Sequence, residues 1–196
     1  MTTAPALAPE RPAARKRDAD ATRAAILDAA KIHFARSGYN GAFLRDIAAD
    51  AGADAALINR YFGGKDGLFA AALKDSIGPN TIAEWDRKSF AADIAKMMAG
   101  HAHQHVERTH AFQFLLQAAT NPATAPLLNV AVQERFMGPI RKWIGGDNVE
   151  ARARIFASVF IGLLVERLIR DEPLADSERD VFIERTSALL QSLVDQ

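Results

Sequence analysis

The feature that most constrains the fold is a pair of short helical patterns joined by a turn that contains glycine. Segments 43–50 and 55–62 each have the length of about two helical turns. Between them, Gly52 allows the backbone to bend sharply, and Asp54 can accept a hydrogen bond from the free N–H groups that open the second helix. The pattern therefore predicts a helix-turn-helix arrangement.

Longer helices are expected on both sides of this pair. Apolar residues recur at helical spacing over 20–37, and Gly38 then offers a C-terminal cap. A further helix is expected over 65–77 and should end at Gly78, which a proline follows. Together these segments predict a helical domain over residues 20–77.

The first 19 residues have a composition that cannot build a core. They are rich in alanine and proline and carry the cluster RKR at 15–17. We expect a flexible basic arm over 1–19. The arm either adds reach toward a nucleic acid or is a solvated tail, and both readings stay open.

Composition narrows the class of protein. The chain has 196 residues and no cysteine, so a disulfide framework and a thiolate metal site are both excluded. Lys plus Arg and Asp plus Glu number 24 each, so any affinity for nucleic acid must come from local segregation of charge. Neither a signal-peptide core nor a run of about 18 apolar residues is present. We expect a cytoplasmic protein with no membrane partner.

The helix expected over 55–62 divides its side chains by size and polarity. Leu57, Ile58 and Phe62 are expected to face the bracing helices. Asparagine can pair with adenine, arginine with guanine or phosphate, and an alanine methyl can touch the thymine methyl. The residues left for a major groove are Ala55, Ala56, Asn59, Arg60 and Tyr61. On spacing alone, a small helical subdomain with a polar face fits as well.

The segment from Thr22 to Leu73 resembles the DNA-binding domain of the TetR (tetracycline-repressor-like) family of bacterial transcriptional regulators. The resemblance lies in ILDAA followed by GY, in RDIA followed by AG, and in INRYFGGKDGLF at 58–69. It implies that Arg45 lies on the helix that crosses the DNA backbone. It also implies phosphate contacts for Tyr61 and Lys65. The residues that it places facing the groove are Ala55, Ala56, Asn59 and Arg60.

Several positions depart from the family pattern. Ala42 and Phe43 stand where the family usually has a small hydroxyl residue, which leaves Asn40 as the candidate cap of the second helix. Asn59 replaces an aromatic residue, and Gly64 replaces the more common serine. The operator sequence is expected to differ accordingly.

The remainder, 78–196, shows helical patterns and no strand-like alternation of any length, so the fold class is all-α. The resemblance implies a C-terminal effector-binding and dimerisation domain, with a homodimer formed by the last two helices. The apolar residues assigned to that interface are Phe156, Phe160, Leu163 and Leu189. The helices are expected at about 81–88, 90–106, 109–120, 123–144, 148–170 and 177–195.

Aromatic and thioether side chains in this domain are candidates for binding a small, apolar effector, as the resemblance implies. For any one of these residues, ordinary core packing is the competing reading. The candidate ligand-binding residues are Trp85, Met97, His101, His105, Phe112 and Phe136.

The run HAHQH at 101–105 has two imidazoles at i and i+4, which share a helix face. No third ligand completes a metal site by spacing, so no metal or cofactor is expected. Glycine-rich nucleotide motifs and catalytic triad patterns are also missing, so no enzyme is expected. The sequence thus predicts a DNA-binding regulator, a repressor released by its effector. The alternative is a ligand- or metal-binding helical protein whose helix-turn-helix no longer reads DNA.

Overall fold

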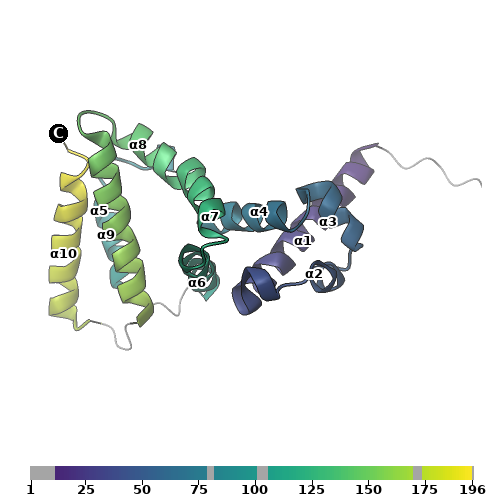
Figure 1. Ribbon diagram of the computed structural model, residues 1–196. Helices are drawn as coiled ribbons and strands as arrows, with labels where there is room; N and C mark the ends of the chain where they lie inside the picture. Colours follow the sequence, from purple (N-terminus) through teal and green to yellow (C-terminus); the bar gives the residue numbers. More distant parts are fainter. Residues whose placement is uncertain (1–11, 79–81, 101–105, 170–173, 196) are drawn as a thin grey trace, which may run out of the picture. The chain divides into compact units, whose positions relative to one another are not determined.

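The computed structural model describes residues 12–78, 82–100, 106–169 and 174–195, and every regular element in these ranges is helical. The expected all-α class is therefore confirmed (Figure 1). The chain divides between Ala72 and Leu73 into two compact units.

The first unit contains the helix-turn-helix. Its elements are α1 (Pro12–Gly41), α2 (Leu44–Asp50), α3 (Ala55–Phe62) and the first residues of α4 (Lys65–Ile77). The bounds predicted for α3 and α4 are confirmed, and α2 begins one residue later than predicted. Local signals, a capping aspartate and paired glycines, fix these ends, which is why the sequence located them well.

Helix α1 begins at Pro12, eight positions before the predicted start at residue 20, so residues 12–19 of the predicted flexible arm are helical. Proline is tolerated in the first turn, and the alanines, arginines and lysine after it are good helix formers. The helix is kinked at Gly38, where φ is 65° and ψ is −179°. The chain then makes one more turn to Gly41 before α2.

The core of the first unit is apolar and draws on all four helices. Phe34, Ile47 and Ile58 have no exposed surface, and burying each such side chain contributes about 1.5–3 kcal/mol. Leu57 and Phe62, predicted to face inward, are half-buried. The other fully or nearly fully buried members are Ile26, Ala30, Leu68, Phe69 and Ala72.

Near the start of the second unit, one predicted helix does not form. The predicted helix at 81–88 is wrong, because only the single turn η1 (Ile82–Glu84) forms there. Asp86 stops it: its carboxylate accepts a hydrogen bond from the N–H of Lys88 at 3.1 Å, and its carbonyl accepts from Ser89 and Phe90. Aspartate thus offers the backbone a turn in place of a helix.

The remaining elements of the second unit are helices. In it, α5, α9 and α10 lie side by side, and α5 packs along α10 (Figure 1). Their bounds are α5 (Phe90–Ala99), α6 (Val106–Thr120), α7 (Ala125–Val132), η3 (Gln133–Met137), α8 (Gly138–Ile144), α9 (Val149–Ile169) and α10 (Asp176–Ser192). None of the helices in the described ranges is long and apolar enough to cross a membrane.

A π-helical turn, η3, joins α7 to α8 in one continuous helical run. Pro139 has no N–H for an ordinary helical hydrogen bond, and its ring would crowd the carbonyl four residues earlier. The helix widens before it, and the N–H of Gly138 donates to the carbonyl of Gln133. A β-carbon at residue 138 would lie 2.9 Å from that oxygen, which explains the glycine.

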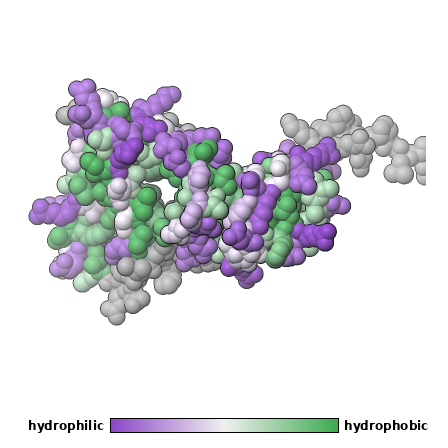
Figure 2. Space-filling view, viewed as in Figure 1, coloured by the Kyte–Doolittle hydropathy of each residue, from purple (hydrophilic) through white to green (hydrophobic). Residues whose placement is uncertain are grey.

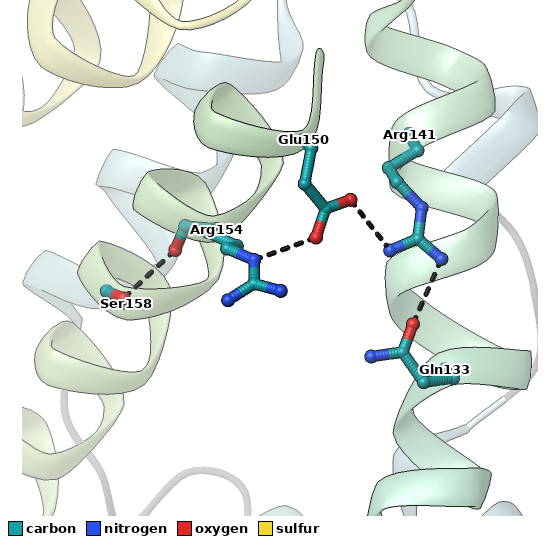
Figure 3. Close-up of polar contacts among 5 residues, drawn as sticks. All are labelled: Gln133, Arg141, Glu150, Arg154 and Ser158. Atoms are coloured by element: carbon teal, nitrogen blue, oxygen red, sulfur yellow. Dashed lines mark hydrogen bonds and ion pairs between the residues drawn. The ribbon is translucent and has the colours of Figure 1, made fainter. Parts of the chain in front are cut away.

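A polar network ties η3 and α8 to α9 (Figure 3). Arg141 donates to Gln133 at 2.9 Å and to Glu150 at 3.1 Å, while Glu150 also accepts from Arg154 at 2.7 Å. The hydrogen bond from Arg154 and the charge of Arg141 lower the pKa of Glu150. The network is exposed to solvent, so it orients the helices more than it stabilises them.

Two arginines hold the end of α10. The Nη2 atoms of Arg87 and Arg152 lie 3.0 and 2.9 Å from the carbonyl oxygen of Val194. Arg152 also donates from Nε to the carbonyl of Leu193 at 2.9 Å. Cations near these otherwise unsatisfied carbonyls stabilise a helix C-terminus.

Candidate nucleic-acid interface

Helix α3 presents a polar face over a buried anchor. Ile58 has no exposed surface, so the register of α3 on the core is fixed. Ala56, Asn59 and Arg60 are exposed, and Ala55 and Tyr61 are half-buried. The residues predicted to face a groove are thus brought together on one short helix, with the side chains of Asn59 and Arg60 accessible to a ligand.

Both ends of α3 are defined by specific residues. At its start, Asp54 accepts a hydrogen bond from the N–H of Ala56 at 2.7 Å, as predicted. At its end, the N–H of Gly63 donates to the carbonyl of Asn59 at 3.0 Å. Gly63 and Gly64 have φ values of 76° and 106°, a region that glycine adopts without steric cost. The paired glycines therefore turn the chain from α3 into α4.

A third glycine in this region was not singled out from the sequence. Gly67 lies in the first turn of α4, and a β-carbon there would overlap the carbonyl oxygen of Phe62. The signal was available, because glycine inside a helix costs about 1 kcal/mol relative to alanine. Gly67 lets the start of α4 approach the end of α3 closely.

Lys65, the predicted phosphate contact, is half-buried at the start of α4. Its Nζ atom lies 4.8 Å from the centroid of the Tyr39 ring and 3.5 Å from the carbonyl oxygen of Asn40. The hydroxyl of Tyr39 donates to Asp66, and this bond raises the pKa of Tyr39 to about 12. Lys65 is therefore held against the end of α1.

The start of α2 differs from expectation. Phe43 occupies the capping position and makes no capping bond, and 64% of its surface is exposed. Asn40 does not cap α2 either, because α1 continues through Asn40 to Gly41. The carbonyl oxygen of Asn40 instead accepts a hydrogen bond from Lys65. Arg45, which the resemblance places on the helix that crosses the DNA backbone, is exposed on α2.

In the second unit, the candidate ligand-binding residues do not all lie in one cluster. Trp85 and Phe136 lie in one aromatic cluster, with ring centroids 6.4 and 6.2 Å from that of Phe156. Met97 packs against the same core. Phe112 is half-buried on α6. His101 and His105 lie outside the described residues.

The residues assigned to the dimer interface differ in their exposure, and the assignment of Phe156 is wrong. Phe156 has no exposed surface within the single chain, so it belongs to the core and cannot face a partner. Phe160 and Leu163 are half-buried, and Leu189 is 48% exposed. Among the described residues, no cluster of three histidine, aspartate or glutamate side chains could hold a metal ion.

Comparison with protein families identifies the chain. The family described as bacterial regulatory proteins of the tetR family matches residues 26–72, and the tetracyclin repressor-like C-terminal domain matches residues 89–194. The chain belongs to the TetR family. It is accordingly a transcriptional regulator with a helix-turn-helix for DNA.

An individual relative agrees with this assignment. The chain is 48% identical over 78 residues to the HTH-type transcriptional repressor SCO4008 of Streptomyces coelicolor, a match that covers 35% of this chain and 41% of that relative. The chain thus spans less than half the length of this relative.

Solved structures share the fold. A protein from Rhodococcus sp. assigned to the TetR-family regulators has a TM-score of 0.64 at 18% identity, covering 90% of this chain and all of that one. The multidrug binding protein EbrR, complexed with malachite green, has a TM-score of 0.61 at 20% identity, covering 89% and 98% of the two chains.

Proposed function

We propose that this TetR-family regulator is a cytoplasmic, homodimeric repressor that binds a pseudo-palindromic operator through α3 and leaves it when a small, apolar effector binds the second unit. The single observation that carries the DNA-binding part is the face of α3. Asn59 and Arg60 stand exposed beside Ile58, which is fully buried and fixes the helix.

Each polar side chain of the proposed interface has a role that its chemistry supports. Asn59 can pair with adenine and Arg60 with guanine, each such pair with a base contributing about 1–3 kcal/mol of discrimination. Arg60 can alternatively contact phosphate, which gives affinity without discrimination. Arg45, Tyr61 and Lys65 serve the phosphate backbone, which sets orientation and affinity without reading sequence.

The dimer is proposed from the apolar surface of the last two helices. Ile155 and Ile161 on α9 are 48% and 47% exposed, and Val181 and Leu189 on α10 are 50% and 48% exposed. Figure 2 shows hydrophobic residues in green at the surface of these helices, among hydrophilic ones in purple. Apolar surface of this kind favours association with a second copy, and a two-fold dimer matches two half-sites.

The effector is proposed from the aromatic cluster of the second unit. Phe136 and Phe160 stack at 5.9 Å between centroids, and both are only partly buried. EbrR, which shares the fold, has also been solved with ethidium, so a protein of this fold can hold an aromatic molecule. Release of DNA requires that the effector bind the two conformational states with different affinity.

Electrophoretic retardation of the DNA beside the protein's own gene tests the proposal. Wild type is expected to retard one fragment. Arg60→Ala and Lys65→Ala should each raise the Kd for that fragment about five- to 150-fold, as expected for a lost contact of about 1–3 kcal/mol. Lys88→Ala, which changes an exposed lysine of the second unit, is the matched control and should bind as wild type does. If wild type retards no fragment, the alternative of a helix-turn-helix that no longer reads DNA replaces the repressor.

A further inference from the structure

We propose that Tyr39 is a positioning residue, which holds the ammonium group of Lys65 where it can meet a DNA phosphate. The inference rests on the proposed DNA-binding function, because it assigns a role to a residue that supports one of its contacts. Tyr39 lies on α1, 26 positions before Lys65, so spacing along the chain does not reveal the relationship.

The contact itself is a cation–π pair. The Nζ atom of Lys65 lies 4.8 Å from the centroid of the Tyr39 ring, within the distance of about 6 Å at which a ring face attracts a cation. The same ammonium group donates to the carbonyl of Asn40 at 3.5 Å. A flexible lysine is thus restricted to one region before DNA arrives, which reduces the entropy lost on binding.

Tyr39 can position a neighbour because its own ring is fixed. The ring meets Phe69 edge to face, with centroids 5.0 Å apart, and stacks on Phe34 at 6.3 Å. Phe34 and Phe69 are both buried. The hydroxyl of Tyr39 donates to Asp66, so the ring is held at its edge as well as its face.

The bond from Tyr39 to Asp66 also engages the carboxylate nearest to Lys65 along the chain. Adjacent residues on a helix do not face each other, and no carboxylate within the described part of the chain lies in ion-pair contact with Lys65. The charge of Lys65 is thus directed to a π face and a carbonyl. Neither neutralises the charge, so it remains available to an anion. Lys65 opens the 13-residue helix α4, whose first N–H groups favour an anion too.

A double-mutant cycle in operator binding tests the inference. Tyr39→Leu removes the ring and should raise the Kd about two- to fivefold, the range expected for a cation–π contact. Lys65→Ala should lower the slope of log K against log salt by about 0.9, as for one lost phosphate contact. In the Lys65→Ala background, Tyr39→Leu should add no further loss. An equal loss in both backgrounds, or none in wild type, would overturn the inference.

Because Tyr39 packs against the core, a second series keeps the test independent of folding. Tyr39→Phe keeps the ring, and stepwise fluorination of that ring weakens its attraction for a cation without changing its shape. The Kd for the operator should rise with each fluorine when Lys65 is present and stay constant in Lys65→Ala. If wild type binds the operator but fluorination leaves the Kd unchanged, the inference is overturned and the proposed DNA-binding function is not. Wild type that binds no operator would overturn both.

Discussion

The carbonyl group of Phe62 lies directly against Gly67, and a β-carbon at Gly67 would come within 2.9 Å of the carbonyl carbon and overlap its oxygen. Phe62 is the last residue of α3, and Gly67 lies in the first turn of α4. The contact joins the helix that carries Asn59 and Arg60 to the helix that carries Lys65. The relative placement of the proposed base-reading and phosphate-binding groups therefore depends on a missing side chain.

Gly67→Ala is expected to lower the free energy of unfolding by about 1–3 kcal/mol, the usual range for overpacking. Helix propensity alone predicts the opposite, a gain of about 1 kcal/mol, because alanine is the better helix former. Urea unfolding followed by circular dichroism measures the difference. A variant more stable than wild type would show that the close approach of Phe62 does not restrict this position.

The two N-caps of the helix-turn-helix should respond in opposite directions. Asp54→Ala removes a capping bond and should cost about 1 kcal/mol of unfolding free energy. Phe43→Ser supplies a capping hydroxyl where the backbone already has the extended geometry of a cap, and should add about 1 kcal/mol. The same unfolding experiment measures both. A loss of stability in Phe43→Ser would mean that the exposed ring has an unseen partner within the chain.

Local signals in the sequence were enough for the helix-turn-helix, while tertiary contacts were not predictable. Asp54 and the paired glycines locate α3 because a cap and a turn act through neighbouring residues. The helix predicted at 81–88 does not form, because Asp86 makes a turn there. The apolar pattern showed no sign of that turn. Apolar residues look alike in sequence, so Phe156, a core residue, was placed at the dimer interface.

The candidate site shows the same difference between local signals, which the sequence reveals, and tertiary contacts, which it does not. The polar residues of α3 were predictable because helical spacing sorts them from Ile58. The environment of Lys65 was not, since Tyr39 and Asn40 reach it from α1 through the fold.

Dimerisation through α9 and α10 can be tested by placing a charge on their exposed apolar residues. Ile161→Glu and Leu189→Glu should give a monomeric mass by light scattering at micromolar concentration, where wild type is expected to be a dimer. Val130→Glu is the matched control, because Val130 is 51% exposed but lies on α7. A dimer that survives both changes on α9 and α10 would place the interface elsewhere.

The hydrogen bond between Tyr39 and Asp66 predicts a dependence of stability on alkaline pH. The bond raises the pKa of Tyr39 from 10.0 to about 12, so the folded state holds the hydroxyl proton more tightly than the unfolded state. Its contribution is complete below pH 10 and is lost as the pH rises through 12. Unfolding of wild type and Tyr39→Phe should therefore differ at pH 9 and converge near pH 12. A constant difference across this range would contradict the assignment.

A footprint on the DNA beside the protein's own gene tests the central claim most directly. Wild type should protect one pseudo-palindrome whose half-sites lie about 10 base pairs apart, or a multiple of that distance, on one face of the duplex. Asn59→Ala should lose the preference at defined base pairs while keeping general affinity for DNA. Wild type that protects no segment in preference to the rest of the fragment, at any concentration up to the one at which general DNA binding covers all of it, would contradict operator recognition by α3.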